Sequence, residues 1–165
     1  MDWSFFIDGR EEAVYPAGRI RLKAKTKSTA GYSGTPLAGK LGFKPGYLVY
    51  AIAPPPDYEE LLAPLPEGLK IIRNLRGTPD AVHLFSRDRA ELSKLLPKLM
   101  NEIPPDGMIW ISWPKKASGV PSTITEDGIR EIALPLGLVD IKVCAVDETW
   151  SGLKLVIRRE NRKRK

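Results

Sequence analysis

The chain has 165 residues, of which 42% are hydrophobic and 28% charged, and its net charge is +6. These values are typical of a soluble globular protein of one domain with a sizeable core. No stretch approaches the roughly 18 apolar residues of a membrane span, and the N-terminus lacks a signal-peptide pattern, so we expect a cytoplasmic protein. Cys144 is the only cysteine and His83 the only histidine, which excludes an intrachain disulfide and a cysteine zinc cluster. We predict no metal site.

Residues 1–33 are predicted to form a basic β appendage and a linker. Residues 13–50 carry seven basic and no acidic side chains, and cations alternate there with smaller or apolar residues, as in a strand with one basic face. These cations are Arg19, Arg21, Lys23, Lys25 and Lys27. Together with a basic tail at residues 161–165 they could bind nucleic acid. Alternatively, they lie on the mildly acidic body of the chain or form a homodimer contact.

Residues 34–160 are predicted to alternate helices with strands. In the first half we expect helices over 35–42 and 57–62, strands over 47–53, 69–73 and 81–85, and a longer helix with an apolar stripe after Asp88. Met108 to Trp113 predicts a strand buried on both faces. Thr123 and Glu126 predict a capping box for a helix that ends at Gly137. Alternation over 139–146 and 153–157 predicts an antiparallel hairpin with a loop over 147–152.

This order of elements predicts an α/β fold. We expect a three-layer, Rossmann-like and methyltransferase-like architecture whose mostly parallel sheet ends in an antiparallel hairpin. Two features of a cofactor-binding methyltransferase are missing. The turn after the first strand, Ala53 to Asp57, has no glycine, and the second strand is followed by Asn74 instead of an acid that could hold a ribose. The sequence therefore identifies no cofactor, and an enzyme of this architecture is an alternative interpretation.

The loop after the central strand is the first candidate site, because ligands of open α/β sheets bind beyond the carboxyl ends of the strands. Lys115, Lys116 and Ser118 in this loop could hold a phosphate or a carboxylate, and Trp113 borders them. The alternative is a solvated connection whose lysines balance nearby acids.

The hairpin loop is the second candidate. Asp147, Glu148 and Trp150 could bind a cation or supply a general base. In the alternative, Trp150 packs over the end of the sheet while an acid pairs with Lys115 or Lys116. The direction of the hairpin strands decides whether both loops share one edge. We expect His83, which lies in an apolar strand, to be a hydrogen-bonded core residue.

Three segments resemble a known family. They are residues 35–46 (TPLAGKLGFKPG), 109–119 (IWISWPKKASG) and 136–160 (LGLVDIKVCAVDETWSGLKLVIRRE). They are similar to an uncharacterised bacterial family known as domain of unknown function 3052, with a likeness over about residues 34–160. The resemblance implies a small cytoplasmic bacterial α/β protein and supplies no activity, cofactor or catalytic residue.

We interpret residues 34–160 as a non-enzymatic α/β domain that binds a small anion or a protein partner at the carboxyl edge of its sheet. No catalytic residue is predicted. The alternatives are a nucleic-acid-binding protein that uses the basic N-terminal strand with the C-terminal tail, and an enzyme of methyltransferase-like architecture.

Overall fold

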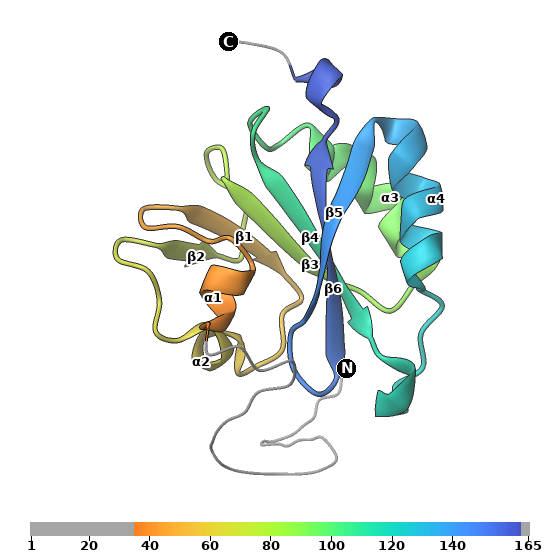
Figure 1. The fold of residues 1–165 in the computed structure, drawn as a ribbon, viewed down its shortest axis with the longest axis horizontal. Coiled ribbons are helices and arrows are strands. Elements are labelled where there is room, and N and C mark those ends of the chain that lie inside the picture. The colour runs from red at the N-terminus through yellow and green to blue at the C-terminus, as the bar shows by residue number, and fades with distance from the viewer. Residues whose placement is uncertain (1–34, 163–165) are drawn as a thin grey trace. The chain divides into compact units, whose positions relative to one another are not determined.

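The computed structural model describes residues 35–162, whose centre is a six-stranded sheet in the order β2-β1-β3-β4-β6-β5 (Figure 1). The strands are β1 (Leu48–Ile52), β2 (Lys70–Ile72), β3 (Ala81–Phe85), β4 (Met108–Pro114), β5 (Leu138–Ala145) and β6 (Trp150–Ile157). The helices are α1 (Leu37–Lys40), α2 (Tyr58–Leu62), α3 (Arg89–Met100) and α4 (Glu126–Leu136), and the short 3-10 helices are η1 (Lys116–Ser118) and η2 (Arg159–Asn161).

The whole sheet belongs to one compact unit, which comprises the described residues 35–54 and 59–162. Residues 55–58 are grouped outside it and form a turn in which the Tyr58 N–H donates to the Pro55 carbonyl at 3.1 Å. The predicted appendage over residues 1–33 and its five alternating cations lie outside the described residues. None of the helices between residues 35 and 162 has the length and apolar character needed to cross a membrane.

The strand directions confirm the predicted fold class. The first four strands are parallel, with β1 between β2 and β3, and β3 beside β4. The hairpin of β5 and β6 is antiparallel, and β6 also pairs antiparallel with β4. Because β6 runs opposite to β4, it begins where β4 ends, and Trp150 pairs with Pro114. The β5–β6 loop therefore lies at the carboxyl edge of the parallel strands.

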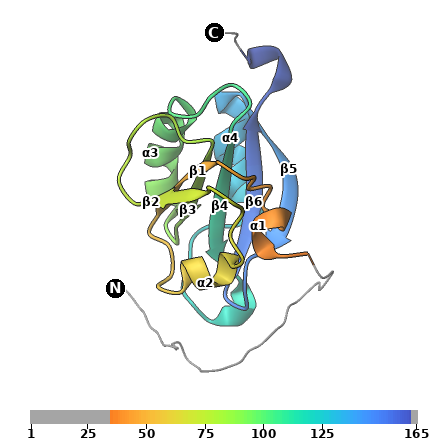
Figure 2. The same ribbon diagram turned by 90° about the vertical axis from the view of Figure 1, so that its left-hand side faces the viewer.

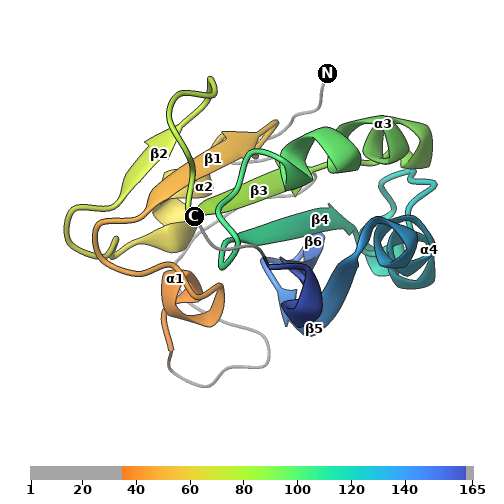
Figure 3. The same cartoon turned by 90° about the horizontal axis from the view of Figure 1, so that it is seen from above.

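One face of the sheet is covered by α3 and α4 (Figure 3). Buried apolar side chains from alternate positions of the central strands pack there against the apolar stripes of the two helices. They include Val82, Leu84, Ile109, Ile111, Leu153, Leu155, Leu92, Leu96, Ile129 and Ala133. Each valine, leucine or isoleucine among them contributes about 1.5–3 kcal/mol by leaving water, so this layer contains the main core.

The opposite face carries α1, and Figure 2 shows α1 and α3 on opposite sides of the sheet. The indole N–H of Trp110 donates to the Leu41 carbonyl at 2.8 Å, which ties the end of α1 to the middle of β4. Gly152 of β6 leaves the necessary space, because a Cβ atom there would lie 3.0 Å from Cε3 of Trp110. The Trp110 ring thus packs directly over the backbone of Gly152, where any larger residue would collide with it.

The helix caps differ in two places from the prediction, and the first is α1, whose N-cap is Pro36 and not the expected Thr35. Asp88 caps α3 as its position suggested, and its carboxylate accepts from the Ala90 N–H at 2.9 Å. The N-cap of α4 is Thr125, whose hydroxyl accepts from the Gly128 N–H at 3.0 Å, so the predicted capping box at Thr123 is wrong. Thr123 instead accepts the Arg89 N–H at 2.8 Å, because the two helices are neighbours in the fold.

The hairpin loop is shorter than predicted. Trp150 lies in β6, three positions before the strand start expected at Leu153. Asp147 causes this, since one of its carboxylate oxygens accepts the N–H groups of Thr149 and Trp150, both at 2.8 Å. This side-chain turn closes the loop early and lets the strand begin at Trp150.

Candidate functional site

The two predicted loops lie side by side at the carboxyl edge of the sheet. Trp150 starts β6 opposite Pro114, the last residue of β4. Just beyond this pair, the N–H of Lys115, which follows Pro114, donates to the carbonyl of Thr149, which precedes Trp150, at 2.8 Å. The strand direction that the sequence left open is therefore the one that brings Lys115–Gly119 next to Asp147–Thr149.

The lysine loop is a tight turn with its hydroxyl directed inward. The Ser118 hydroxyl donates to the Lys115 carbonyl at 2.6 Å and accepts from the Val120 N–H at 3.2 Å. Gly119 follows in the left-handed conformation, with φ at 78°. Lys116 is exposed and Lys115 half-buried. Ser118 thus shapes the turn, and the two ammonium groups are the parts of the loop that offer charge to a ligand.

The acidic loop uses its first carboxylate for its own structure. Asp147 accepts the two N–H groups of the turn described above, whereas Glu148 is exposed. Trp150 is 6% exposed, and its ring packs edge-on against Phe85 with 5.1 Å between centroids. Trp113 is 9% exposed and belongs to the core on the α3 side. Both tryptophans are thus packing residues that border the edge.

Behind this edge lies a small aromatic cluster with a buried hydrogen bond. His83 is fully buried, stacks on Phe85 with 4.2 Å between centroids, and shares a hydrogen bond of 2.7 Å between its Nε2 and the Ser112 hydroxyl. Burial lowers the pKa of His83 from 6.5 to about 3, because a charged imidazolium loses its hydration there. A neutral, hydrogen-bonded core histidine is what the sequence predicted.

A lysine cluster on the α1 face was missed by the sequence analysis. Lys142 and Lys154 lie directly opposite each other in the β5–β6 pair, and the Lys142 ammonium group donates to the Lys40 carbonyl at 2.7 Å. A β-bulge between Asp140 and Lys142 produces this arrangement. The only signal in the sequence is the number of lysines, because a bulge is not visible in an alternating pattern.

Arg130 on α4 is the centre of the largest ion-pair network among residues 35–162. Its guanidinium donates to Asp140 at 2.9 Å, to Asp127 at 2.9 Å and to Glu126. The hydrogen bonds to Asp140 and then Glu126 raise the Arg130 pKa, and the network joins α4 to β5.

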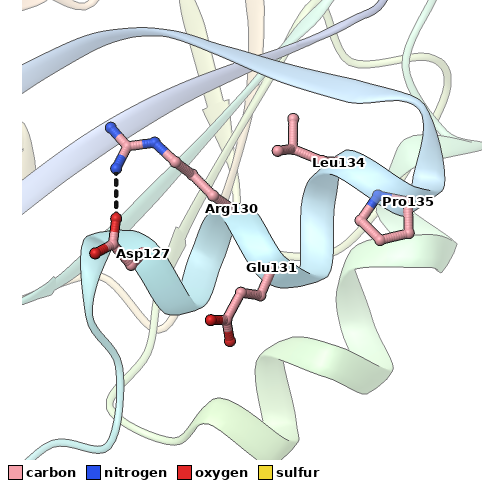
Figure 4. A pocket seen from close by; sticks show the side chains of 5 residues that line it. All are labelled: Asp127, Arg130, Glu131, Leu134 and Pro135. Atoms are coloured by element: carbon pink, nitrogen blue, oxygen red, sulfur yellow. Dashed lines mark hydrogen bonds and ion pairs between the residues drawn. The ribbon is translucent and has the colours of Figure 1, made fainter.

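A shallow hollow on the outside of α4 borders this arginine (Figure 4). Figure 4 shows the guanidinium engaged with Asp127. The remaining lining residues are Glu131, Leu134 and Pro135. Since its cation is already neutralised, the hollow offers little to a charged ligand.

Within the described range, no three histidine, cysteine or acidic residues are grouped as a metal site would require.

The basic C-terminal segment is described only up to Arg162. Arg158 lies 3.9 Å from Glu160, and the Arg162 side chain donates to the Ile157 carbonyl at 2.9 Å. Nucleic-acid binding by this segment and the alternating cations of residues 19–27 stays a prediction.

Three solved structures with a similar fold are methyltransferases. A SAM-dependent methyltransferase from Aquifex aeolicus is 14% identical with a TM-score of 0.51, and the match covers 73% of this chain and 88% of that one. Magnesium protoporphyrin IX methyltransferase from Synechocystis PCC 6803 is 14% identical with a TM-score of 0.48, and the match covers 73% of this chain and 74% of that one. Ribosomal protein L11 methylase from Lactobacillus delbrueckii subsp. bulgaricus is 11% identical with a TM-score of 0.48, and the match covers 74% of this chain and 76% of that one. At such identities the likeness to the Aquifex protein shows a shared fold alone.

The family comparison confirms the resemblance predicted from the sequence. No curated protein matches the chain. A family model described as "Protein of unknown function (DUF3052)" matches residues 67–159, which include β4, the hairpin and both edge loops. The match covers more than half of the chain, and the chain therefore belongs to the DUF3052 family.

Proposed function

We propose that this chain is a non-enzymatic binding domain that takes a small anion, or an acidic segment of a protein partner, at the carboxyl edge of its sheet. The charge balance of the edge supports this function. Within residues 35–162, neither Lys115 nor Lys116 pairs with a carboxylate. Of the two acids in the adjacent loop, Asp147 already accepts two N–H groups of its own turn, and Glu148 forms no ion pair within residues 35–162. Two cations are thus left for an anion from outside.

The residues at the neighbouring strand ends do not fit the methyl-donor cofactor that the fold suggests. Ala53 follows β1 with φ at 54°, a left-handed conformation that favours glycine. Its methyl group and the following prolines, in place of glycines, hinder a close approach of ligand to backbone. Asn74, shortly after β2, has no carboxylate for a ribose. A binding role therefore agrees better with these residues than methyl transfer.

Calorimetry with citrate and inorganic phosphate tests the proposed function. We expect the double variant Lys115→Gln/Lys116→Gln to bind the better of the two anions at least about tenfold more weakly, because two charge-assisted contacts are lost. A matched control, Lys94→Gln/Lys98→Gln on α3, removes the same charge from exposed positions and should bind like the wild type. An equal loss in both variants would remove the site from this edge.

S-adenosylmethionine is the probe for the enzyme alternative. We expect no heat when it is titrated into the folded protein. A saturable heat that survives the Lys115→Gln/Lys116→Gln exchange would contradict the non-enzymatic role and return the cofactor to the end of β1.

A further inference from the structure

The hairpin places two like charges directly opposite each other. Lys142 of β5 pairs with Lys154 of β6, and Trp110 of β4 is the next residue in the same row. Like charges at directly opposed positions of an antiparallel pair repel and destabilise it. Such a breach of local rules is often found at functional positions.

Two more lysines, Lys40 and Lys44, complete the cluster at the end of α1. The Lys142 ammonium group lies 2.7 Å from the Lys40 carbonyl. The Lys154 ammonium group lies against Gly42, where an added Cβ atom would be 3.2 Å from it. Partial burial first, and then the charges of Lys142 and Lys44, lower the Lys154 pKa. Lys142 and Lys44 therefore act on Lys154. Lys40 and Lys142 both act on the neighbouring Cys144 thiol, because burial raises the pKa of that thiol and their charges lower it.

No carboxylate among residues 35–162 neutralises this cluster. Asp140, the nearest acid along β5, pairs with Leu155 on the other side of the bulge and binds Arg130 on the α4 side of the sheet. A purely structural role accounts for one of the three N–H groups of Lys142, which donates to the end of α1. For Lys154, whose side chain is half-buried, a structural role accounts for none of the three N–H groups of the ammonium.

We propose that Lys40, Lys44, Lys142 and Lys154 form a binding site for a phosphate-bearing anion on the sheet face that carries α1. A multiply charged phosphate group would relieve the repulsion that the fold builds in, and compact ammonium groups suit phosphate oxygens as point charges. The phosphate can belong to a small molecule or to a nucleic-acid backbone. This site is separate from Lys115 and Lys116, and it does not depend on the function proposed for them.

Binding of two probes to the full chain tests the site. One is pyrophosphate, followed by calorimetry, and the other is a single-stranded oligonucleotide, followed by fluorescence anisotropy, both at about 50 mM salt because screening weakens such contacts. We expect Lys142→Gln/Lys154→Gln to weaken at least one probe about tenfold or more. The Lys94→Gln/Lys98→Gln and Lys115→Gln/Lys116→Gln variants should stay within about twofold of the wild type for that probe.

The pattern of losses identifies the source of the phosphate. A loss for pyrophosphate supports a small phosphorylated ligand, and a loss for the oligonucleotide alone supports a nucleic-acid backbone. If the wild type binds neither probe, or if neither probe is weakened specifically by the Lys142 and Lys154 exchanges, the proposal is overturned. Thermal unfolding checks that the variants fold, and pyrophosphate or the oligonucleotide should raise the Tm of the wild type more than that of the double variant.

Discussion

Lowering the pH is expected to destabilise the protein through its single histidine, His83. The imidazole is fully buried, and its pKa in the folded chain is about 3, against the ordinary histidine value of 6.5. Between these two values the unfolded chain binds a proton that the folded chain does not. The contribution of His83 to the free energy of unfolding is therefore complete above its pKa in the unfolded chain. It is lost as the pH falls toward its pKa in the folded chain.

The size of the loss follows from these two pKa values. Each unit of pKa difference corresponds to about 1.4 kcal/mol, so the full window is worth about 5 kcal/mol. At about pH 5 the proton on the unfolded chain costs about 2 kcal/mol of unfolding free energy, and at about pH 4 it costs about 3 kcal/mol. Most carboxylates titrate below about pH 5, so the first of these losses reports on the histidine.

Urea unfolding followed by tryptophan fluorescence measures this loss at about pH 7.5, 6 and 5. The control is His83→Gln, whose amide can still bond to the Ser112 hydroxyl but does not titrate. We expect the wild type to lose about 2 kcal/mol over this range and the variant to lose about 0.5 kcal/mol or less. A wild type with constant stability down to pH 5, or a variant with the same slope, would show that the folded protein accommodates a protonated His83.

Three further substitutions test separate parts of the packing by urea unfolding. Gly152→Ala should cost about 1–3 kcal/mol, because its methyl group would meet Trp110; an unchanged midpoint would mean that the ring moves aside freely. Ala53→Gly should stabilise by about 1 kcal/mol by relieving its positive φ, whereas Ala145→Gly in β5 should destabilise. Lys154→Met should stabilise by about 0.5 kcal/mol because it removes a cross-strand repulsion, and a loss of stability would contradict the strained charge pair.

The buried parallel strands could be predicted because each one is a short apolar run between turn signals. The range predicted for β3, residues 81–85, is the observed one, and β4 extends the predicted central strand only by Pro114. The same reasoning placed the lysine loop at the carboxyl edge. It could not place the hairpin loop beside it, because that depends on β6 running antiparallel to β4, a pairing between segments more than thirty residues apart.

Side-chain hydrogen bonds explain where the local predictions failed. Thr123 and Glu126 have the spacing of a capping box, but the Thr123 hydroxyl accepts from Arg89 of a different helix. The loop predicted over 147–152 ends early, because the Asp147 carboxylate closes it and draws Trp150 into β6; a ligand or base role of Asp147 stays a prediction. A short polar side chain can serve its own turn, a neighbouring element or a ligand, and sequence spacing does not distinguish these partners.

The lysine cluster was hidden by a single extra residue in β5. Strict alternation would put Asp140 and Lys142 on the same face, where the carboxylate could balance the ammonium group. The bulge at Ile141 moves them to opposite faces: Asp140 pairs with Leu155 and binds Arg130, and Lys142 is placed across from Lys154. One irregularity thus separates a potential ion pair, neutralises the α4 side and leaves the α1 side with uncompensated positive charge. Bulges are common in edge strands such as β5, so it is the uncompensated charge, and not the bulge itself, for which we assign this face a ligand.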